Sequence, residues 1–284
     1  LSPATESDLF RDAFPDRFFT AGIAEANMIG VAAGMARCGD IPFVHSFSVF
    51  LTRRAFDQVA MQVAYPNLNV KLVGFLPGLT TLLGVSHQAI DDLTLMLVLP
   101  NMTVIEPAGA SQTAAVVRAA AKINGPVYLR LHKAREPITN TAVEKNLEVG
   151  KGQLLRDGDD AVIFACGYMV AEALLAAETL YLSGINVTVA NMHTIKPFDS
   201  EFVLKQSIRT GVVLSAENHS VIGGLGSAIA EVLAERPAGV DIDFKRIGIS
   251  DTFAEGGTTA YLFDKYGLSA RHIVAAVHDL LERR

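Results

Sequence analysis

The hydrophobic pattern alternates short apolar runs with longer segments of helical periodicity. The run 161–166 is apolar throughout, as is typical of strands buried on both faces of a parallel sheet. The longer segments, such as 169–182, are rich in apolar residues at helical spacing, which predicts helices packed on the sheets. Strands that alternate with helices predict an α/β fold with mostly parallel sheets.

The pattern gives approximate bounds for these elements. Strands are predicted at 18–22, 43–47, 70–75, 103–106, 126–131, 161–166, 187–191, 212–216 and 244–249. Helices are predicted at 25–36, 52–64, 88–99, 111–123, 169–182, 226–234 and 269–284. Thr52 and Ser269 are the expected N-caps of two of them, because a hydroxyl can accept from the free N–H groups of a first helical turn.

The pattern lapses between residues 132 and 152. This stretch is rich in Lys, Arg, Glu, Asn and Thr and contains Pro137. Two α/β domains are therefore predicted, at 1–135 and 151–284, joined by a linker at 136–150. The first residue is Leu1 rather than methionine, so residues are expected to be missing upstream.

Composition narrows the class of protein. Half of the 284 residues are hydrophobic and the formal net charge is -6, so the chain can bury a sizeable core. It has no long basic run, and neither nucleic acid nor a membrane is an expected partner. Cys38 and Cys166 form no CxxC motif, which favours a reducing, cytoplasmic location.

Two candidate groups precede helices or follow strands in the first domain. Glu25 opens a helix at the carboxyl end of a predicted strand, where open α/β sheets bind ligands. It is equally an acid that would interact favourably with the helix dipole. Phe47 and Phe50 are spaced to form a platform for a flat heterocycle, although aromatic residues at this spacing are often plain core.

Other candidates lie in loops. His87 follows the glycine-rich loop 78–84 and could move protons near neutral pH, or could be structural. Arg130 and His132, at a strand exit, are candidates for binding a phosphate group, or could start a solvated linker. The glycines of 223–226 do not fit the dinucleotide motif and predict close strand–helix packing.

As an ordered set, these motifs resemble the transketolase family over nearly the whole chain. In the first domain, 22–28, 32–36, 50–58, 86–92, 100–102 and 106–107 resemble the pyrimidine-binding domain of transketolases and deoxyxylulose-phosphate synthases. In the second, 193–199 and 217–226 resemble the transketolase C-terminal domain.

The resemblance implies thiamine diphosphate as the cofactor and assigns roles to individual residues. It places Glu25 against the pyrimidine N1′, where a shared proton favours the imino tautomer that deprotonates the thiazolium C2. It places Phe47, Phe50 and Arg53 around the pyrimidine ring. His87 would lie near the substrate hydroxyls, and either His132 or Arg130 would bind the sugar phosphate.

Two departures from the family pattern qualify this picture. The loop 79–84 lacks the acid that family members carry before the histidine, which puts the usual pentose phosphates in doubt as substrates. The diphosphate-binding Gly-Asp-Gly motif is also missing, because 158–160 reads as a turn. Mg²⁺ or Ca²⁺ and the diphosphate would therefore be bound by an N-terminal transketolase subunit in an α2β2 heterotetramer.

The function implied is the C-terminal subunit of a split transketolase. It would transfer a two-carbon ketol unit from a ketose phosphate to an aldose, and only together with its partner. The alternatives are a deoxyxylulose-phosphate synthase, the β subunit of a 2-oxoacid dehydrogenase, and a partner subunit without catalytic function.

Overall fold

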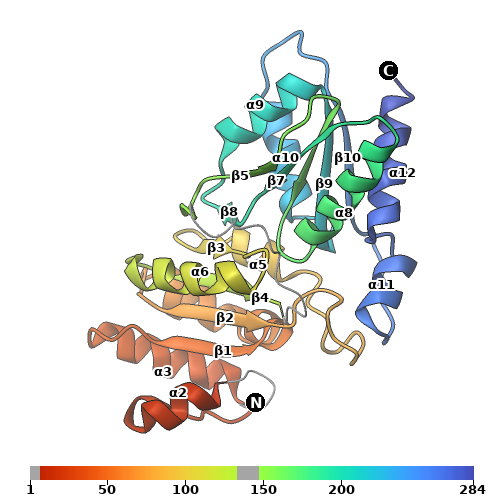
Figure 1. The fold of residues 1–284 in the computed structure, drawn as a ribbon. Coiled ribbons are helices and arrows are strands. Elements are labelled where there is room, and N and C mark those ends of the chain that lie inside the picture. The colour runs from red at the N-terminus through yellow and green to blue at the C-terminus, as the bar shows by residue number, and fades with distance from the viewer. Residues whose placement is uncertain (1–6, 133–146) are drawn as a thin grey trace.

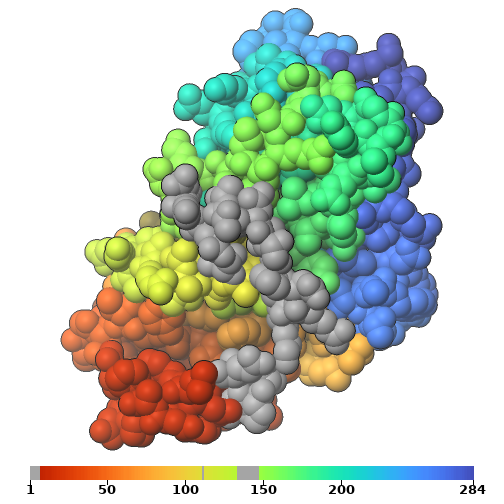
Figure 2. Space-filling view, in the orientation of Figure 1, coloured from red at the N-terminus to blue at the C-terminus, as the bar shows by residue number. Residues whose placement is uncertain are grey.

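A computed structural model describes residues 7–132 and 147–284. Most of the predicted linker lies outside these residues. The two halves of the chain form two stacked α/β units, with the first half below the second in Figures 1 and 2.

The first sheet has the strand order β1-β2-β4-β3-β8. Its strands are β1 (Phe43–Phe47), β2 (Lys71–Phe75), β4 (Val127–Leu131), β3 (Thr103–Ile105) and β8 (Thr194–Lys196). The first four pair in parallel, whereas β8 pairs antiparallel with β3. Because β8 comes from the second half of the chain, that half contributes the edge strand of the first sheet.

Helices surround this sheet. They are α2 (Asp8–Ala13), the 3-10 turn Pro15–Arg17, α3 (Glu25–Arg37), α4 (Phe56–Gln58), α5 (Asp92–Leu97) and α6 (Ala110–Lys122). Two π-helical stretches, Phe50–Arg54 and Val59–Ala64, lie on either side of α4. β2 and β4 are almost wholly buried, as expected of central parallel strands.

The second sheet has the order β10-β9-β6-β7-β5. Its strands are β10 (Asp243–Ile249), β9 (Val212–Ser220), β6 (Ala161–Ala165), β7 (Val187–Asn191) and β5 (Gln153–Arg156). The helices are α8 (Met169–Leu182), α9 (Ser200–Thr210), α10 (Leu225–Ala234), α11 (Thr259–Lys265) and α12 (Ala270–Leu281). α8 packs with α12 and α9 packs with α10.

The hydrophobic core is continuous between the two units. Leu93 and Tyr128 of the first unit belong to the same buried cluster as Phe164 and Leu225 of the second. Leu79, from the loop after β2, is fully buried in the cluster built mainly by the second unit. The shared core predicts that the units unfold cooperatively rather than as independent bodies.

Three predicted elements differ from the structure. Residues 18–22 form no strand, and Gly22 has a φ of 74° that breaks the extended run. Thr52 is not an N-cap: its hydroxyl donates to the Ser48 carbonyl at 2.8 Å inside a helix that has already begun. The helix expected from residue 88 begins only at Asp92, because Ala89 makes a strand-like bridge with Pro77.

Other elements were not anticipated. β5, β8, α9 and α11 are short or lie where polar residues mask the period. The start of α9 is marked in the sequence by an N-cap residue. The Asp199 side chain accepts a hydrogen bond from the Phe202 amide at 3.2 Å. Ser269 does occupy the N-cap position of α12, but its hydroxyl contacts Asp264 and His272 instead of a backbone amide.

In the part of the chain that the structure describes, no helix is both long and apolar enough to span a membrane.

Candidate active site

The carboxylate of Glu25 is buried at the start of α3, with its side chain 1% exposed. It does not cap the helix, since the N-cap is Ala24 and no side chain binds the first-turn amides. Instead it accepts from Arg54 at 2.9 Å and from the Ser46 hydroxyl at 3.4 Å. The carboxylate is buried and makes no hydrogen bond to the helix amides. A favourable interaction with the helix dipole therefore does not by itself explain its position.

Two phenylalanines and a histidine meet beside this carboxylate. The Phe47 and Phe50 ring centroids lie 5.8 Å apart, at the end of β1 and the start of the following helix. The His87 ring packs edge-on against both, at 5.7 Å from Phe47 and 5.1 Å from Phe50. The structure thus brings together four predicted site residues from three separate segments.

Arg53 links the helix after β1 to the segment after His87. Its Nε donates to the Asp91 carboxylate at 2.7 and 2.9 Å, and its Nη2 donates to the Gln88 carbonyl at 3.4 Å. The predicted contact of Arg53 with the cofactor remains a prediction. In the structure, Arg53 connects the segment that carries Phe50 to the segment that follows His87.

Arg54 is the site residue that the sequence reasoning missed. Its guanidinium carbon lies 4.3 Å from the Phe50 ring centroid, in addition to the ion pair with Glu25. Its side chain is 48% exposed, so it can move away from the carboxylate. The repeated arginine at 53–54 was visible, but only the fold reveals which of the two reaches Glu25.

Arg130 is not available to a phosphate group. It is fully buried, and it donates to Asp92 at 2.8 and 3.0 Å and to Glu106 at 2.7 Å. It also donates to the backbone carbonyls of Ala89 and Asn218. With these partners the guanidinium is an internal structural group, and the expectation of phosphate binding is corrected for this residue.

His132 lies at the edge of the same buried network. Its Nε2 is 2.6 Å from Glu106 Oε1, and its side chain is only 6% exposed. Burial by itself would raise the pKa of the Glu106 carboxyl, but Arg130 and His132 outweigh this and lower it to about 2. Phosphate binding by His132 therefore stays a prediction, since the residues that follow it lie outside the described ranges.

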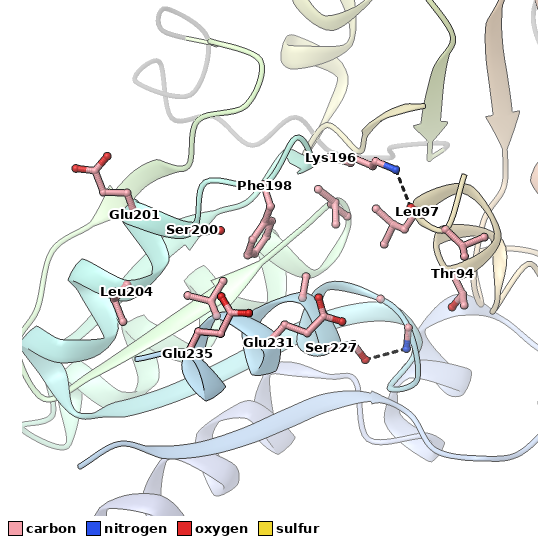
Figure 3. Close-up of a pocket in the computed structure, with 16 residues that line it drawn as sticks. Thr94, Leu97, Lys196, Phe198, Ser200, Glu201, Leu204, Ser227, Glu231 and Glu235 are labelled. Atoms are coloured by element: carbon pink, nitrogen blue, oxygen red, sulfur yellow. Dashed lines mark hydrogen bonds between the residues drawn. The ribbon is translucent and has the colours of Figure 1, made fainter. Parts of the chain in front are cut away.

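A groove of about 830 Å³ lies away from these residues. It is lined by α5, α9, α10 and the segment around Phe198, with Glu231 and Glu235 on one side (Figure 3). None of the predicted site residues lines it. This groove is therefore separate from the Glu25 cluster.

The metal-binding half of the expected site is not found in the described ranges. Within residues 7–132 and 147–284, no cluster of His, Cys, Asp or Glu could hold a metal ion. The 158–160 segment is a bend between β5 and β6, in which Asp159 pairs with Arg209 at 2.9 Å. The acid and the two aromatic rings fit the pyrimidine end of thiamine diphosphate, whereas the part of the chain that the structure describes offers no ligand set for a cation.

Comparisons with known proteins decide the family. The model of the transketolase pyrimidine-binding domain matches residues 2–137, and that of the transketolase C-terminal domain matches residues 150–273. This chain belongs to the transketolase family. Transketolases use thiamine diphosphate to transfer ketol units, and the chain corresponds to a C-terminal transketolase subunit.

Relatives of similar length support this assignment. The chain is 48% identical to a 6-deoxy-6-sulfo-D-fructose transketolase subunit from Clostridium sp. (strain MSTE9), over all of this chain and 87% of that protein. It is 42% identical to a putative transketolase C-terminal section from Methanocaldococcus jannaschii, over all of this chain and 89% of that protein.

A solved structure has the same fold. It is described as a split gene transketolase, inactive beta4 tetramer, and superposes with a TM-score of 0.88 at 47% identity. The match covers 96% of this chain and 87% of that one. The predicted α/β fold and the predicted resemblance to a split transketolase are both confirmed.

Proposed function

We propose that this chain is the catalytic C-terminal subunit of an α2β2 transketolase that transfers a two-carbon ketol unit from a ketose phosphate to an aldose. The observation that carries the proposal is the buried Glu25 carboxylate paired with Arg54, whose guanidinium lies over the Phe50 ring that packs against His87. A helix-opening acid with only a structural role would not need to be buried beside an arginine that lies over an aromatic ring.

Glu25 would hold a proton at the pyrimidine N1′. The Phe47 and Phe50 rings would pack against the flat face of the pyrimidine ring. When bound, thiamine diphosphate supplies the carbon nucleophile that attacks the ketose carbonyl. His87, in contact with both rings, would orient a substrate hydroxyl or exchange a proton with it. In the free chain Arg54 pairs with this carboxylate at 2.9 Å, so the arginine would compete with the cofactor for it.

The requirement for a second chain has two supports. One is the lack of a cation site among the described residues. The other is the exposure of large apolar side chains close in sequence to the site residues: Phe19 and Ile23, before Glu25, are 70% and 83% exposed, and Leu82 and Leu83, before His87, are 67% and 58% exposed. Large apolar side chains grouped on a surface mark sites of protein contact. An N-terminal subunit would cover them and bind the diphosphate through Mg²⁺ or Ca²⁺.

The test is reconstitution with an N-terminal transketolase subunit from the same organism. We expect the two to co-elute from gel filtration and to transfer ketol units only as a mixture with thiamine diphosphate and Mg²⁺. Each subunit alone should be inactive, in line with the relative described as an inactive beta4 tetramer. Ketol transfer by the lone chain, or separate elution at micromolar concentration, would overturn the proposal.

A sulfonated ketose is a second candidate for the donor. The relative at 48% identity is named for 6-deoxy-6-sulfo-D-fructose, and the loop 79–84 carries the exposed Leu82 and Leu83 where an acid was expected. The same reconstituted enzyme should be assayed with fructose 6-phosphate and with its 6-deoxy-6-sulfo analogue. A kcat/KM at least tenfold higher for the sulfonate would select it, and the reverse ratio would exclude it.

A further inference from the structure

The loop that carries His87 has little structure of its own. This His87 loop, residues 76–88, connects β2 to the segment before α5. Leu76, Gly78 and Gly84 all have positive φ values, so the loop is a succession of turns. Its internal bonds are few and local, such as that from the His87 amide to the Gly84 carbonyl at 2.9 Å. Something outside the loop must therefore fix its path.

Asn218, at the carboxyl end of β9 in the second unit, binds the loop with both ends of its side-chain amide. Its Oδ1 accepts from the Leu79 amide at 2.9 Å, and its Nδ2 donates to the Pro77 carbonyl at 3.3 Å. One partner is a fixed donor and the other a fixed acceptor. A carboxamide satisfies both, whereas a carboxylate or an aliphatic side chain fails at one or both.

Asn218 is itself held firmly. Its side chain is fully buried, and its carbonyl accepts from Arg130 Nη2 at 3.0 Å. Arg130 is fixed in turn by Asp92 and Glu106. The contact is also close: a Cβ on Gly78 would overlap the Asn218 carbonyl and side chain. The loop therefore rests on a rigid part of the second unit.

The second unit also contacts the other end of the His87 loop. Gln88 Nε2 donates to the Glu255 carbonyl at 2.9 Å. A Cβ on Gly256 would lie 3.1 Å from the Leu82 carbonyl, so the two backbones touch. Leu79, beside the Asn218 contact, is buried in the core of the second unit. The loop is thus anchored from its beginning to its end by the unit that contributes no residue to the Glu25 site.

We infer that Asn218 is a positioning residue that holds the His87 loop, and so keeps the His87 ring against Phe47 and Phe50. The catalytic consequence of this inference rests on the proposed function, but the structural part does not. It gives the C-terminal unit a role in setting the position of a group at the active site, although none of its own side chains enters that site.

Hydrogen exchange tests the structural part in the isolated chain. In Asn218→Ala the loop loses two hydrogen bonds of about 1 kcal/mol each, so exchange of the 76–88 amides should speed up about tenfold or more.

The histidine Hε1 NMR signal of His87, assigned with His87→Ala, should move toward its solvent-exposed position as the ring currents of Phe47 and Phe50 are lost. Asn218→Asp keeps the shape and the acceptor but sets a carboxylate oxygen against the Pro77 carbonyl, so it should also speed up exchange of the loop amides.

Asn191→Ala is the matched control. Asn191 is also a buried asparagine at the end of a strand of the second unit, and its Nδ2 lies 3.2 Å from Gln112 Oε1 of the first unit. It makes no contact with the His87 loop, so this variant should leave the loop exchange and the His87 signal as in the wild type. Unchanged exchange and an unchanged His87 signal in both Asn218 variants would overturn the inference.

Activity of the reconstituted enzyme tests the catalytic part. Asn218→Ala should lower kcat about tenfold or more while the Kd for thiamine diphosphate stays within about twofold, because Glu25 and Phe47 are not on the loop. A wild-type kcat in a variant with a loosened loop would overturn the positioning role. If the wild-type pair transfers no ketol units, the proposed function fails, and the exchange and NMR results still decide whether Asn218 holds His87.

Discussion

At the residue scale, the carboxylate of Glu25 is buried and its ion-pair partner, Arg54, is partly exposed. Its carboxylate is almost inaccessible, while the Arg54 guanidinium that pairs with it is about half exposed. A buried charge without a partner is costly, so Arg54 stabilises the free chain. On the proposed function, the same arginine would compete with the cofactor for this carboxylate.

The first prediction concerns the carboxylate itself. Glu25→Gln keeps the size and shape of the side chain but cannot hold the N1′ proton as a carboxylate does. We expect kcat of the reconstituted enzyme to fall by about 10² to 10⁴, the range usual for loss of a proton-transfer group. Circular dichroism and the association with the N-terminal subunit should be unchanged. Turnover close to the wild-type rate would remove Glu25 from the mechanism.

The second prediction concerns the competing cation. In Arg54→Ala the carboxylate is free before the cofactor arrives, so thiamine diphosphate should bind about three- to tenfold more tightly, as measured by titration calorimetry. Arg53→Ala is the control, because Arg53 pairs with Asp91 rather than Glu25 and its loss should bring no tightening. Weaker cofactor binding in Arg54→Ala would show that the arginine helps to hold the cofactor instead.

At the element scale, the local hydrophobic pattern determines where strands and helices form. The conformation of the His87 loop depends instead on contacts across the interface between the units. β6 is apolar along its length and packs as expected for any such strand. The His87 loop, by contrast, is shaped by Asn218 and by a glycine that lets the chain approach it.

Gly78 gives a prediction at this scale. It has a φ of 59° and lies directly against Asn218, whereas Gly184 has a φ of 82° and nothing within 4 Å of an added Cβ. Gly184→Ala should cost only the backbone strain, about 1 kcal/mol. Gly78→Ala should cost clearly more, about 2–4 kcal/mol, because the strain and an overlap with buried groups add. Urea unfolding of the two variants measures the difference, and equal costs would contradict it.

At the scale of the whole molecule, buried ionisable groups join the two units. Glu106, Asp92 and Arg130 of the first unit lie in the same network as Glu217 and His219 of the second. Burial raises the pKa of Glu217 to about 7, although the Gly226 and Leu225 amides act in the opposite direction. The folded chain therefore carries a titrating carboxyl at the interface between the units.

The pH dependence of stability follows from this shift. Between the ordinary pKa of 4.5 and a folded value of about 7, the folded chain binds a proton that the unfolded chain has released. The contribution of Glu217 is therefore fully present below about pH 4.5 and is lost as the pH rises through 7. The shift corresponds to about 3 kcal/mol.

Glu217→Gln tests this prediction. Glutamine does not titrate. The wild type should therefore lose unfolding free energy relative to the variant as the pH rises from 5 to 8. Urea unfolding at several pH values measures the difference. A difference that does not change with pH would show that Glu217 does not titrate in this range.

The sequence by itself predicts the fold class, most of the strands and long helices, and a candidate acid, two aromatic residues and a histidine for the site. It could do so because apolar periodicity is a local property, and because the motif residues keep their order along the chain. Glu25, Phe47, Phe50 and His87 are predicted from the sequence as members of one site, and their cofactor and substrate roles stay predictions.

The tertiary structure decided which polar groups face each other. Arg130 and Arg54 are both arginines near the predicted site, yet one is locked inside a buried ion-pair network and the other reaches Glu25. The contact of Asn218 with Leu79 joins residues 139 positions apart. No period or motif encodes such pairings, because they join residues that are distant in the sequence and meet only when the chain folds and buries them together.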